Sequence, residues 1–100
     1  MKIVERMIQE IHPGQNAALE DLDKRYNAIE SIIGFPPKKR SWCVSGPYPT
    51  STLFIEREWE SMAAMEATFE KAFAHPGLQA LGEEGTSIIK STRIELYMPA

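Results

Sequence analysis

The sequence predicts an α+β fold in which a four-stranded sheet carries two helices on one face. Four segments have the composition and alternation of strands, and two carry apolar residues at steps of three or four, which is typical of helices. Their order is β-α-β-β-α-β, the plan of the ferredoxin-like fold. In that plan the strand order is fourth, first, third, second. We expect an antiparallel or mixed sheet, with the first and third strands central and parallel.

Length and composition indicate one globular domain spanning residues 1–100. The chain is 43% hydrophobic and 25% charged, and its net charge of −3 argues against nucleic acid as a partner. A single cysteine, Cys43, excludes an internal disulfide and fits a reducing compartment. The sequence shows neither the apolar region of a signal peptide nor an apolar run of the ~20 residues that span a bilayer. We therefore expect a cytoplasmic protein without membrane insertion.

The first strand is predicted at residues 2–11, and both of its faces are half apolar. One face carries Ile3, Met7 and Ile11, and the other carries Val4 and Ile8. The triplet HPG at 12–14 then ends the strand and opens a helix, because proline fits the first helical turn. An apolar stripe that includes Tyr26 predicts this helix at residues 15–33, with the stripe facing the sheet.

The basic run at residues 38–40 is interpreted as a solvated loop end before a second strand at 41–45. A turn at 46–49 leads to the third strand, residues 53–59. One face of that strand carries Leu53, Ile55, Arg57 and Trp59, and the other carries Phe54, Glu56 and Glu58. Because neither face is polar, we expect a central strand covered on both sides.

Arg57 lies among apolar neighbours in this strand and therefore needs a carboxylate partner. Glu56 and Glu58 point to the opposite face. The partner is expected to be Glu5 or Glu10 of the first strand, or an acid from a second copy of the chain.

Ser61 is a predicted N-cap for the second helix, which carries the stripe Met62, Met65, Phe69 and Phe73. A second HPG triplet, at 75–77, is expected to break this helix and leave only a short helical turn. The last strand is predicted at residues 86–98.

Two helices can cover only one face of such a sheet, so either Ile3 and Met7 or Val4 and Ile8 would be left uncovered. An apolar sheet face of this size is a liability in a monomer. The patterning therefore predicts a twofold homodimer that packs sheet to sheet.

Three motifs, IHPG at 11–14, SGPY at 45–48 and REWESM at 57–62, occur in this order of elements. Together they resemble the NIPSNAP-like family of the dimeric α/β-barrel superfamily, over nearly the whole chain. The resemblance implies the fold and the dimer. That superfamily includes cofactor-free monooxygenases, dismutating and haem-degrading enzymes and members without known activity, so the resemblance implies no catalytic residue set.

Charged residues gather on three strands that the predicted fold makes adjacent, with aromatic residues nearby. The charged residues are Arg6, Glu10, Glu56, Arg57, Glu58, Arg93 and Glu95, and the aromatic ones are Trp42, Tyr48, Trp59 and Tyr97. They could form a ligand pocket or a structural ion-pair network. The candidate pocket residues are His12, Tyr26, Trp42, Glu56, Arg57, Trp59, Met65, Phe69 and Arg93.

Metal and cofactor chemistry find little support in the sequence. His12, Cys43 and His75 are scattered and lack the close pairing of a zinc motif, so no metal site is expected. Both histidines are interpreted as helix-start residues, and Cys43 as a small buried hydrophobe. No glycine-rich phosphate loop is present, and no cofactor is expected.

Three functions remain open, and whether the protein is an enzyme is one of the open points. The first is a NIPSNAP-like protein that binds a small apolar or aromatic molecule between sheet and helices. The second is a cofactor-independent monooxygenase acting on an aromatic or polyketide-like substrate. In that case Arg57 or Arg93 would stabilise an enolate oxygen, and His12 or Glu56 would take the proton. The third is a protein-interaction module that uses the dimer surface.

Overall fold

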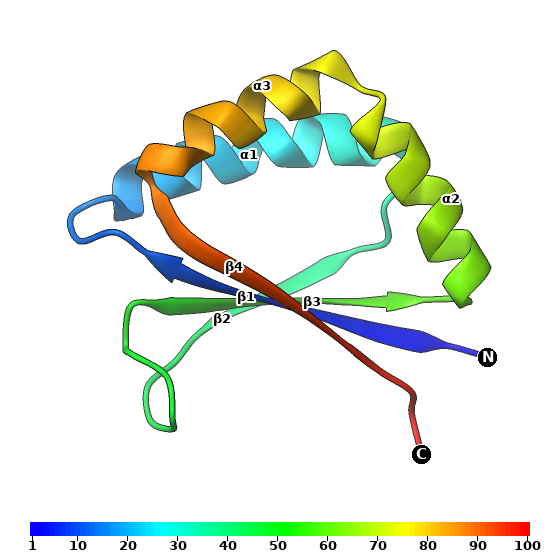
Figure 1. The fold of residues 1–100 in the computed structure, drawn as a ribbon, viewed down its shortest axis with the longest axis horizontal. Helices are drawn as coiled ribbons and strands as arrows, with labels where there is room; N and C mark the ends of the chain where they lie inside the picture. The colour runs from blue at the N-terminus through cyan, green and yellow to red at the C-terminus, as the bar shows by residue number, and fades with distance from the viewer.

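The computed structural model describes residues 1–100 as an open sheet beneath an arch of helices (Figure 1). The elements are β1 Ile3–Ile11, α1 Asn16–Ile33, β2 Lys38–Trp42, β3 Thr52–Trp59, α2 Met62–Phe73, α3 Pro76–Glu84, a 3-10 turn Gly85–Ser87, and β4 Ile89–Tyr97. The strand order is β2-β3-β1-β4, which confirms the ferredoxin-like plan. No helix has the length and apolar content needed to cross a membrane.

All three strand pairs are antiparallel, so the expected parallel pairing of the first and third strands is wrong. The reason lies in the connections. Helix α1 carries the chain back along the sheet, so β2 runs in the direction of β1, and the hairpin after β2 then reverses β3. In the resulting register Ile3 lies opposite Trp59, and Glu10 lies opposite Thr52.

The helices cover one face of the sheet, with α1 and α3 side by side and α2 continuing the layer towards the end of β3 (Figure 1). The main core lies beneath the first half of α1 and the end of α3. It consists of Ile11, Leu19, Leu22, Leu53, Leu81 and Ile88. At the other end Trp59 and Met65 are buried. The space between these two packed ends holds the candidate site.

The two HPG triplets have different roles. The first lies outside α1, which begins at Asn16, and Gly14 adopts a left-handed φ of 76°. The second begins α3, where the Nδ1 atom of His75 accepts a hydrogen bond from the Gly77 N–H at 3.0 Å. The expected short turn is therefore a nine-residue helix, stabilised by this cap and by the burial of Leu81. At α2 the predicted cap is confirmed, because Ser61 Oγ accepts from the Ala64 N–H at 3.0 Å.

Strand β2 starts three residues before its predicted start, so the interpretation of residues 38–40 as a solvated loop end is wrong. Residues of a strand alternate between faces. Lys38 and Arg40 both point to the helix layer, where they form ion pairs with carboxylates of α1. Those ion pairs hold the basic run in the sheet.

The register divides the charged strand residues between two faces. Arg57 lies on the face covered by helices, whereas Arg6, Glu56 and Arg93 lie on the opposite face, which we call the open face. Ile8, Cys43 and Phe54 form a small cluster there, and Tyr48 of the β2–β3 loop packs against it. The cluster confirms Cys43 as a buried hydrophobe, although it lies just beyond β2.

Candidate functional site: a cavity between the sheet and the helices

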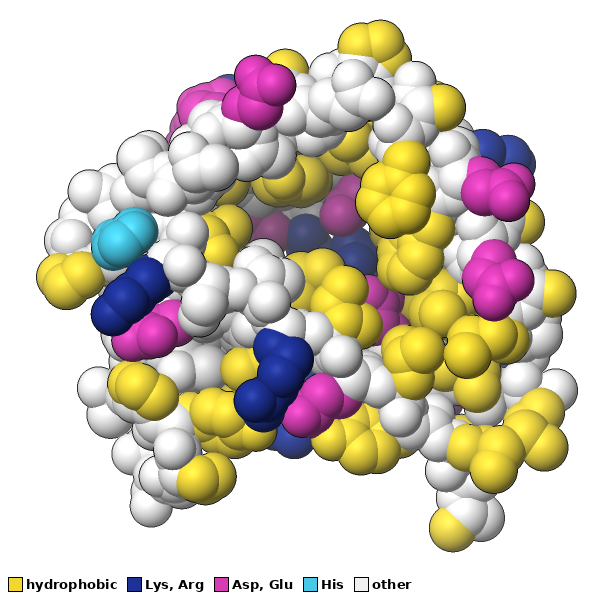
Figure 2. Space-filling model, in the orientation of Figure 1, with side chains coloured by type: hydrophobic (Ala, Val, Ile, Leu, Met, Phe, Trp, Pro, Cys, Tyr) yellow, Lys and Arg dark blue, Asp and Glu magenta, His cyan; other side chains and the backbone are white.

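Two adjoining compartments lie between the sheet and the helices, of about 160 Å³ and about 300 Å³. Met7, Tyr26, Glu30 and Arg57 line both, so the two meet at these side chains. Figure 2 shows the hollow beneath the helix arch, with charged side chains in its depth and hydrophobic ones around it. The larger compartment therefore has mainly apolar walls with charged groups where the two compartments join, whereas the smaller one is also lined by Asp23, Lys38 and Arg40.

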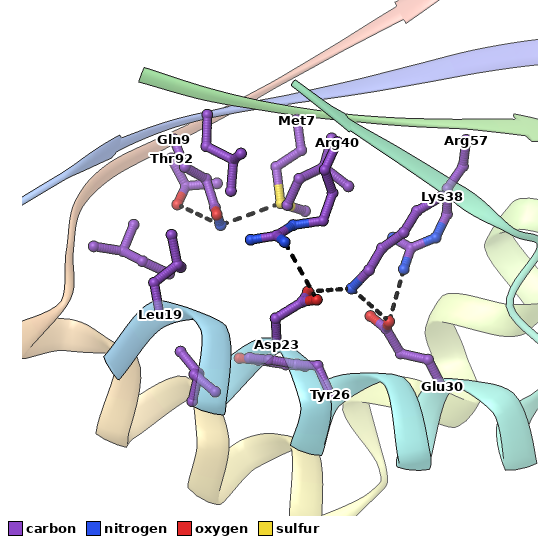
Figure 3. A pocket seen from close by; sticks show the side chains of 14 residues that line it. Met7, Gln9, Leu19, Asp23, Tyr26, Glu30, Lys38, Arg40, Arg57 and Thr92 are labelled. Carbon is purple, nitrogen blue, oxygen red and sulfur yellow. Dashed lines mark hydrogen bonds and ion pairs between the residues drawn. The ribbon is translucent and has the colours of Figure 1, made fainter. Parts of the chain in front are cut away.

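Arg57 forms a buried ion pair with Glu30 of α1 (Figure 3). Its terminal nitrogen lies 2.8 Å from Glu30 Oε1, and the two side chains are 5% and 14% exposed. The prediction that an acid of the first strand or of a second copy would neutralise Arg57 is thus wrong. Glu5 does lie opposite Arg57 in the register, but its carboxylate accepts a hydrogen bond from Trp59 instead.

The Arg57–Glu30 pair belongs to a network of alternating charges between α1 and the strands β2 and β3. Lys38 Nζ lies 3.3 Å from Glu30 and 2.6 Å from Asp23. Arg40 lies 3.6 Å from Asp23, and its two terminal nitrogens bond the carboxylate of Glu20 at 2.9 and 3.0 Å. Fixed pairs of this kind hold α1 at a set distance above the sheet, and that spacing maintains the smaller compartment.

Tyr26 of α1 lines both compartments and packs against the main core, as its place in the apolar stripe predicts. Burial raises the pKa of the Tyr26 hydroxyl, and the negative charges of Glu30 and Glu84 raise it further. The hydroxyl therefore stays protonated at neutral pH and can donate a hydrogen bond inside the cavity.

Aromatic side chains form the walls of the larger compartment. Phe35 and Phe69 lie 6.0 Å apart between ring centres, and Phe69 lies 6.1 Å from Phe73. The compartment reaches solvent beside β4, where Phe73 is 73% exposed and Ile94 is 49% exposed. An aromatic-walled opening with polar groups at its inner end has the usual composition of a small-molecule site.

Glu5 also lines the larger compartment, although it is only 1% exposed. Its Oε1 accepts a hydrogen bond from Trp59 Nε1 at 3.0 Å, and its Oε2 has no hydrogen-bond partner. Sequence reasoning considered Glu5 only as a partner for Arg57. The signal that could have identified it as a site residue is an acid between Ile3 and Met7 on the helix-covered face of a central strand.

The structure brings three of the nine candidate pocket residues together around this cavity, namely Tyr26, Arg57 and Phe69. Trp59 and Met65 are buried near its far end, and the Trp59 ring packs on Phe69 at 5.5 Å. These two residues support the wall without lining the cavity.

The other four candidates lie elsewhere. Glu56 and Arg93 are on the open face, where Arg93 donates to the Tyr48 hydroxyl at 2.9 Å. His12 and Trp42 line a separate surface hollow at the ends of β1 and β2. The sheet therefore separates Glu56 and Arg93 from Arg57, and these residues do not form one site with it.

Comparisons with known proteins give the same fold at low sequence identity. No protein-family model matches the chain, and no curated protein sequence matches it. A NIPSNAP family protein from Agrobacterium tumefaciens superimposes with a TM-score of 0.80 at 20% identity, over 100% of this chain and 94% of that one. A NIPSNAP-like domain protein from Burkholderia xenovorans gives 0.83 at 15% identity, over 99% and 85%.

The same arrangement occurs in an enzyme. SnoaB, a cofactor-independent oxygenase from Streptomyces nogalater, superimposes with a TM-score of 0.68 at 13% identity, over 98% of this chain and 92% of that one. The chain thus has the fold of solved NIPSNAP family proteins and of a cofactor-independent oxygenase, which supports the resemblance to the NIPSNAP-like family seen in its sequence.

Proposed function

We propose that this protein is a NIPSNAP-like homodimer that binds a small molecule with an apolar or aromatic body between its sheet and its helices. The observation that carries the proposal is the compartment of about 300 Å³, walled by Phe35, Phe69 and Phe73 and open to solvent. Ligand pockets combine mainly apolar walls with a few polar groups that fix orientation. Here Tyr26 and the Arg57–Glu30 pair supply such groups.

Apolar surface left in contact with water favours a ligand that buries it. Burial of apolar area stabilises by roughly 25 cal/mol per Å². Phe73, Ile94 and Leu96 are all exposed at or beside the opening. An aromatic ligand in the compartment would remove part of this surface from water without any change of fold.

The homodimer rests on the open face of the sheet. Only 17 of the 100 residues are buried in a single copy, and the helices leave this face uncovered. Tyr48 covers part of it, whereas Val4 and Tyr97, which pair across β1 and β4, remain accessible. A second copy placed there would cover these side chains and leave the cavity on the other side of the sheet free.

An oxygenase is the second candidate, favoured by the structural likeness to SnoaB. Arg57 lies in the cavity, where it could stabilise an enolate oxygen, but it already pairs with Glu30. The proposed proton acceptors His12 and Glu56 lie outside the cavity. The geometry therefore supports ligand binding better than this scheme. A protein-interaction role would use the open face, which the dimer occupies in our proposal.

Filling the larger compartment tests the proposed function. Ala72 lines it from α2, whereas Ala67 is exposed on the same helix. Phenethyl alcohol, a neutral aromatic probe, is titrated into each protein while amide NMR shifts are followed. We expect saturable shifts of cavity residues in the wild type, an affinity at least about tenfold lower for Ala72→Leu, which is about 1.4 kcal/mol, and wild-type affinity for Ala67→Leu. Equal binding by both variants would contradict the proposal, as would a wild type that binds neither phenethyl alcohol nor its charged analogues phenethylamine and hydrocinnamate.

A further inference from the structure

Glu5 is the least exposed ionisable side chain of the protein, and half of its carboxylate is unpaired. One oxygen accepts from Trp59 Nε1 at 3.0 Å, while the other has no hydrogen-bond partner. Nearly all buried polar atoms in native proteins have a partner, and each exception needs an explanation. Glu5 lines the larger compartment, but its Oε2 is buried in the unliganded protein, so a donor on a bound molecule explains the free oxygen if the side chain turns it towards the compartment.

No group of the chain supplies the missing donor. Arg57 lies opposite Glu5 in the register, but it bonds Glu30 at 2.8 Å and the Pro36 carbonyl at 3.3 Å, and its guanidinium lies over the Phe35 ring at 4.8 Å. A second copy cannot supply it either, because the proposed dimer uses the open face and Glu5 points to the helix-covered one.

The charges around the cavity leave Glu5 without a counter-ion. The network above the sheet pairs three cations with three carboxylates: Lys38, Arg40 and Arg57 with Glu20, Asp23 and Glu30. This set is neutral by itself. The larger compartment itself is lined by two carboxylates, Glu5 and Glu30, and by one cation, Arg57, so with these groups ionised it has one negative charge in excess.

The walls next to this carboxylate also favour a cation. Phe35, Phe69 and Phe73 present aromatic rings to the compartment. The faces of aromatic rings attract positive charge, and aromatic cages are the usual recognition element for organic ammonium groups. Arg57 over Phe35 shows that a cation is accommodated against these rings.

We propose that the ligand is an organic ammonium, that is, a protonated amine on an apolar or aromatic body, whose N–H donates to Glu5 Oε2. A neutral hydroxyl could donate the same hydrogen bond but would leave the negative charge unbalanced, and an anionic ligand would add a second one. The inference rests on the proposed function, because it names the chemical class of ligand for the same cavity.

Three probes with the same phenyl ring and two-carbon chain test the charge requirement: phenethylamine, phenethyl alcohol and hydrocinnamate. At pH 7 the amine is an ammonium, since alkyl amines titrate near pH ~10. We expect the wild type to bind phenethylamine at least about tenfold more tightly than the alcohol, and hydrocinnamate more weakly than either. Equal or tighter binding of the alcohol would overturn this inference and leave the proposed function standing. Failure of all three probes to bind would overturn both.

Glu5→Gln tests the residue, with Glu83→Gln as the matched control. Both variants lose one negative charge, but Glu83 is an exposed residue of α3. The glutamine amide still offers an oxygen to Trp59, so the fold should be retained. We expect Glu5→Gln to bind phenethylamine at least about tenfold more weakly and phenethyl alcohol unchanged, which shows that the cavity is intact. Glu83→Gln should match the wild type with both probes. Wild-type affinity of Glu5→Gln for phenethylamine would refute the assignment.

Discussion

Arg57 shows how a single buried charge depends on its neighbours. In the variant Arg57→Met, Glu30 keeps only Lys38, at 3.3 Å, as a partner inside the protein. Removal of one member of a buried ion pair costs about 3–5 kcal/mol, so we expect a loss of roughly 3 kcal/mol in the free energy of unfolding. Urea unfolding followed by tryptophan fluorescence measures this loss.

The double variant Arg57→Met/Glu30→Met tests whether the loss of stability comes from the unpaired Glu30 carboxylate. It removes both charges and leaves Lys38 paired with Asp23 at 2.6 Å. Replacement of a buried ion pair by apolar side chains of similar volume is often neutral or stabilising. We therefore expect the double variant to unfold at a higher urea concentration than the single one. If the single variant unfolds like the wild type, the pair is not structural.

The sequence indicated that Arg57 needs a carboxylate but did not indicate which one. Period 2 along a strand gives the face of a residue, and it contains no information on which helix covers that face. Glu30 lies 27 positions earlier in the chain, on the other side of the cavity, and only the packing of α1 on β3 brings the two together. The place of Glu5 in the cavity could not be predicted for the same reason, because its unpaired oxygen is a property of the folded protein.

At the scale of the element, a glycine-to-alanine substitution at the start of α3 is expected to destabilise the protein, whereas such a substitution in a helix usually stabilises it. A Cβ atom built on Gly77 would lie 2.9 Å from His75 Cε1 and 3.0 Å from Ile29 Cδ1. Gly→Ala inside a helix normally stabilises by about 0.5–1 kcal/mol. Here the methyl group would displace the imidazole that caps the helix, and loss of a cap costs about 1 kcal/mol. We expect Gly77→Ala to lower the melting temperature.

Gly82 of the same helix is the matched control, because a Cβ built there meets no atom within 4 Å. Gly82→Ala should raise the melting temperature by the ordinary helix-propensity effect. Thermal melts of both variants by circular dichroism give the comparison. A rise for both would show that His75 and Ile29 move aside without cost.

The two HPG triplets show that a short sequence motif alone does not determine whether a helix begins there. Their letters are identical, yet one lies in a turn with Gly14 left-handed and the other is the first turn of a helix. The difference comes from the residues after the second triplet. Leu81 is buried in the core below α3, and tertiary packing of such a face supplies most of the stability of a short helix. The start of β2 was likewise misplaced because the carboxylates that hold Lys38 and Arg40 lie on another element.

For the whole molecule, the open face predicts association. We expect light scattering at micromolar concentration to give twice the chain mass of 11.3 kDa. Val4→Glu, on the open face, should shift the mass towards that of one chain, because it places a charge in a desolvated interface. Ile32→Glu, at an exposed position of α1, should keep the dimer. A wild-type mass of 11.3 kDa would contradict the dimer.

The architecture could be predicted because periodicity and turn signals act over short stretches of sequence, and the ferredoxin-like plan is set by their order. The cavity could not. It is the space left where α1 is held above the sheet by ion pairs and where Phe69 and Phe73 of α2 line the larger compartment. Apolar stripes predict which helix residues face the sheet, but they do not predict where a gap remains between those residues and the sheet.

The position of the cavity opening bears on how fast a ligand exchanges. The larger compartment reaches solvent beside β4, near the exposed Phe73 and Ile94, and β4 is an edge strand of the sheet. In many enzymes the opening of a lid, on a timescale of μs–ms, limits product release. Here a molecule can pass over the edge strand while every helix stays in place. Residence time would then depend on affinity alone, so a weakly bound molecule should give NMR signals averaged between its free and bound forms.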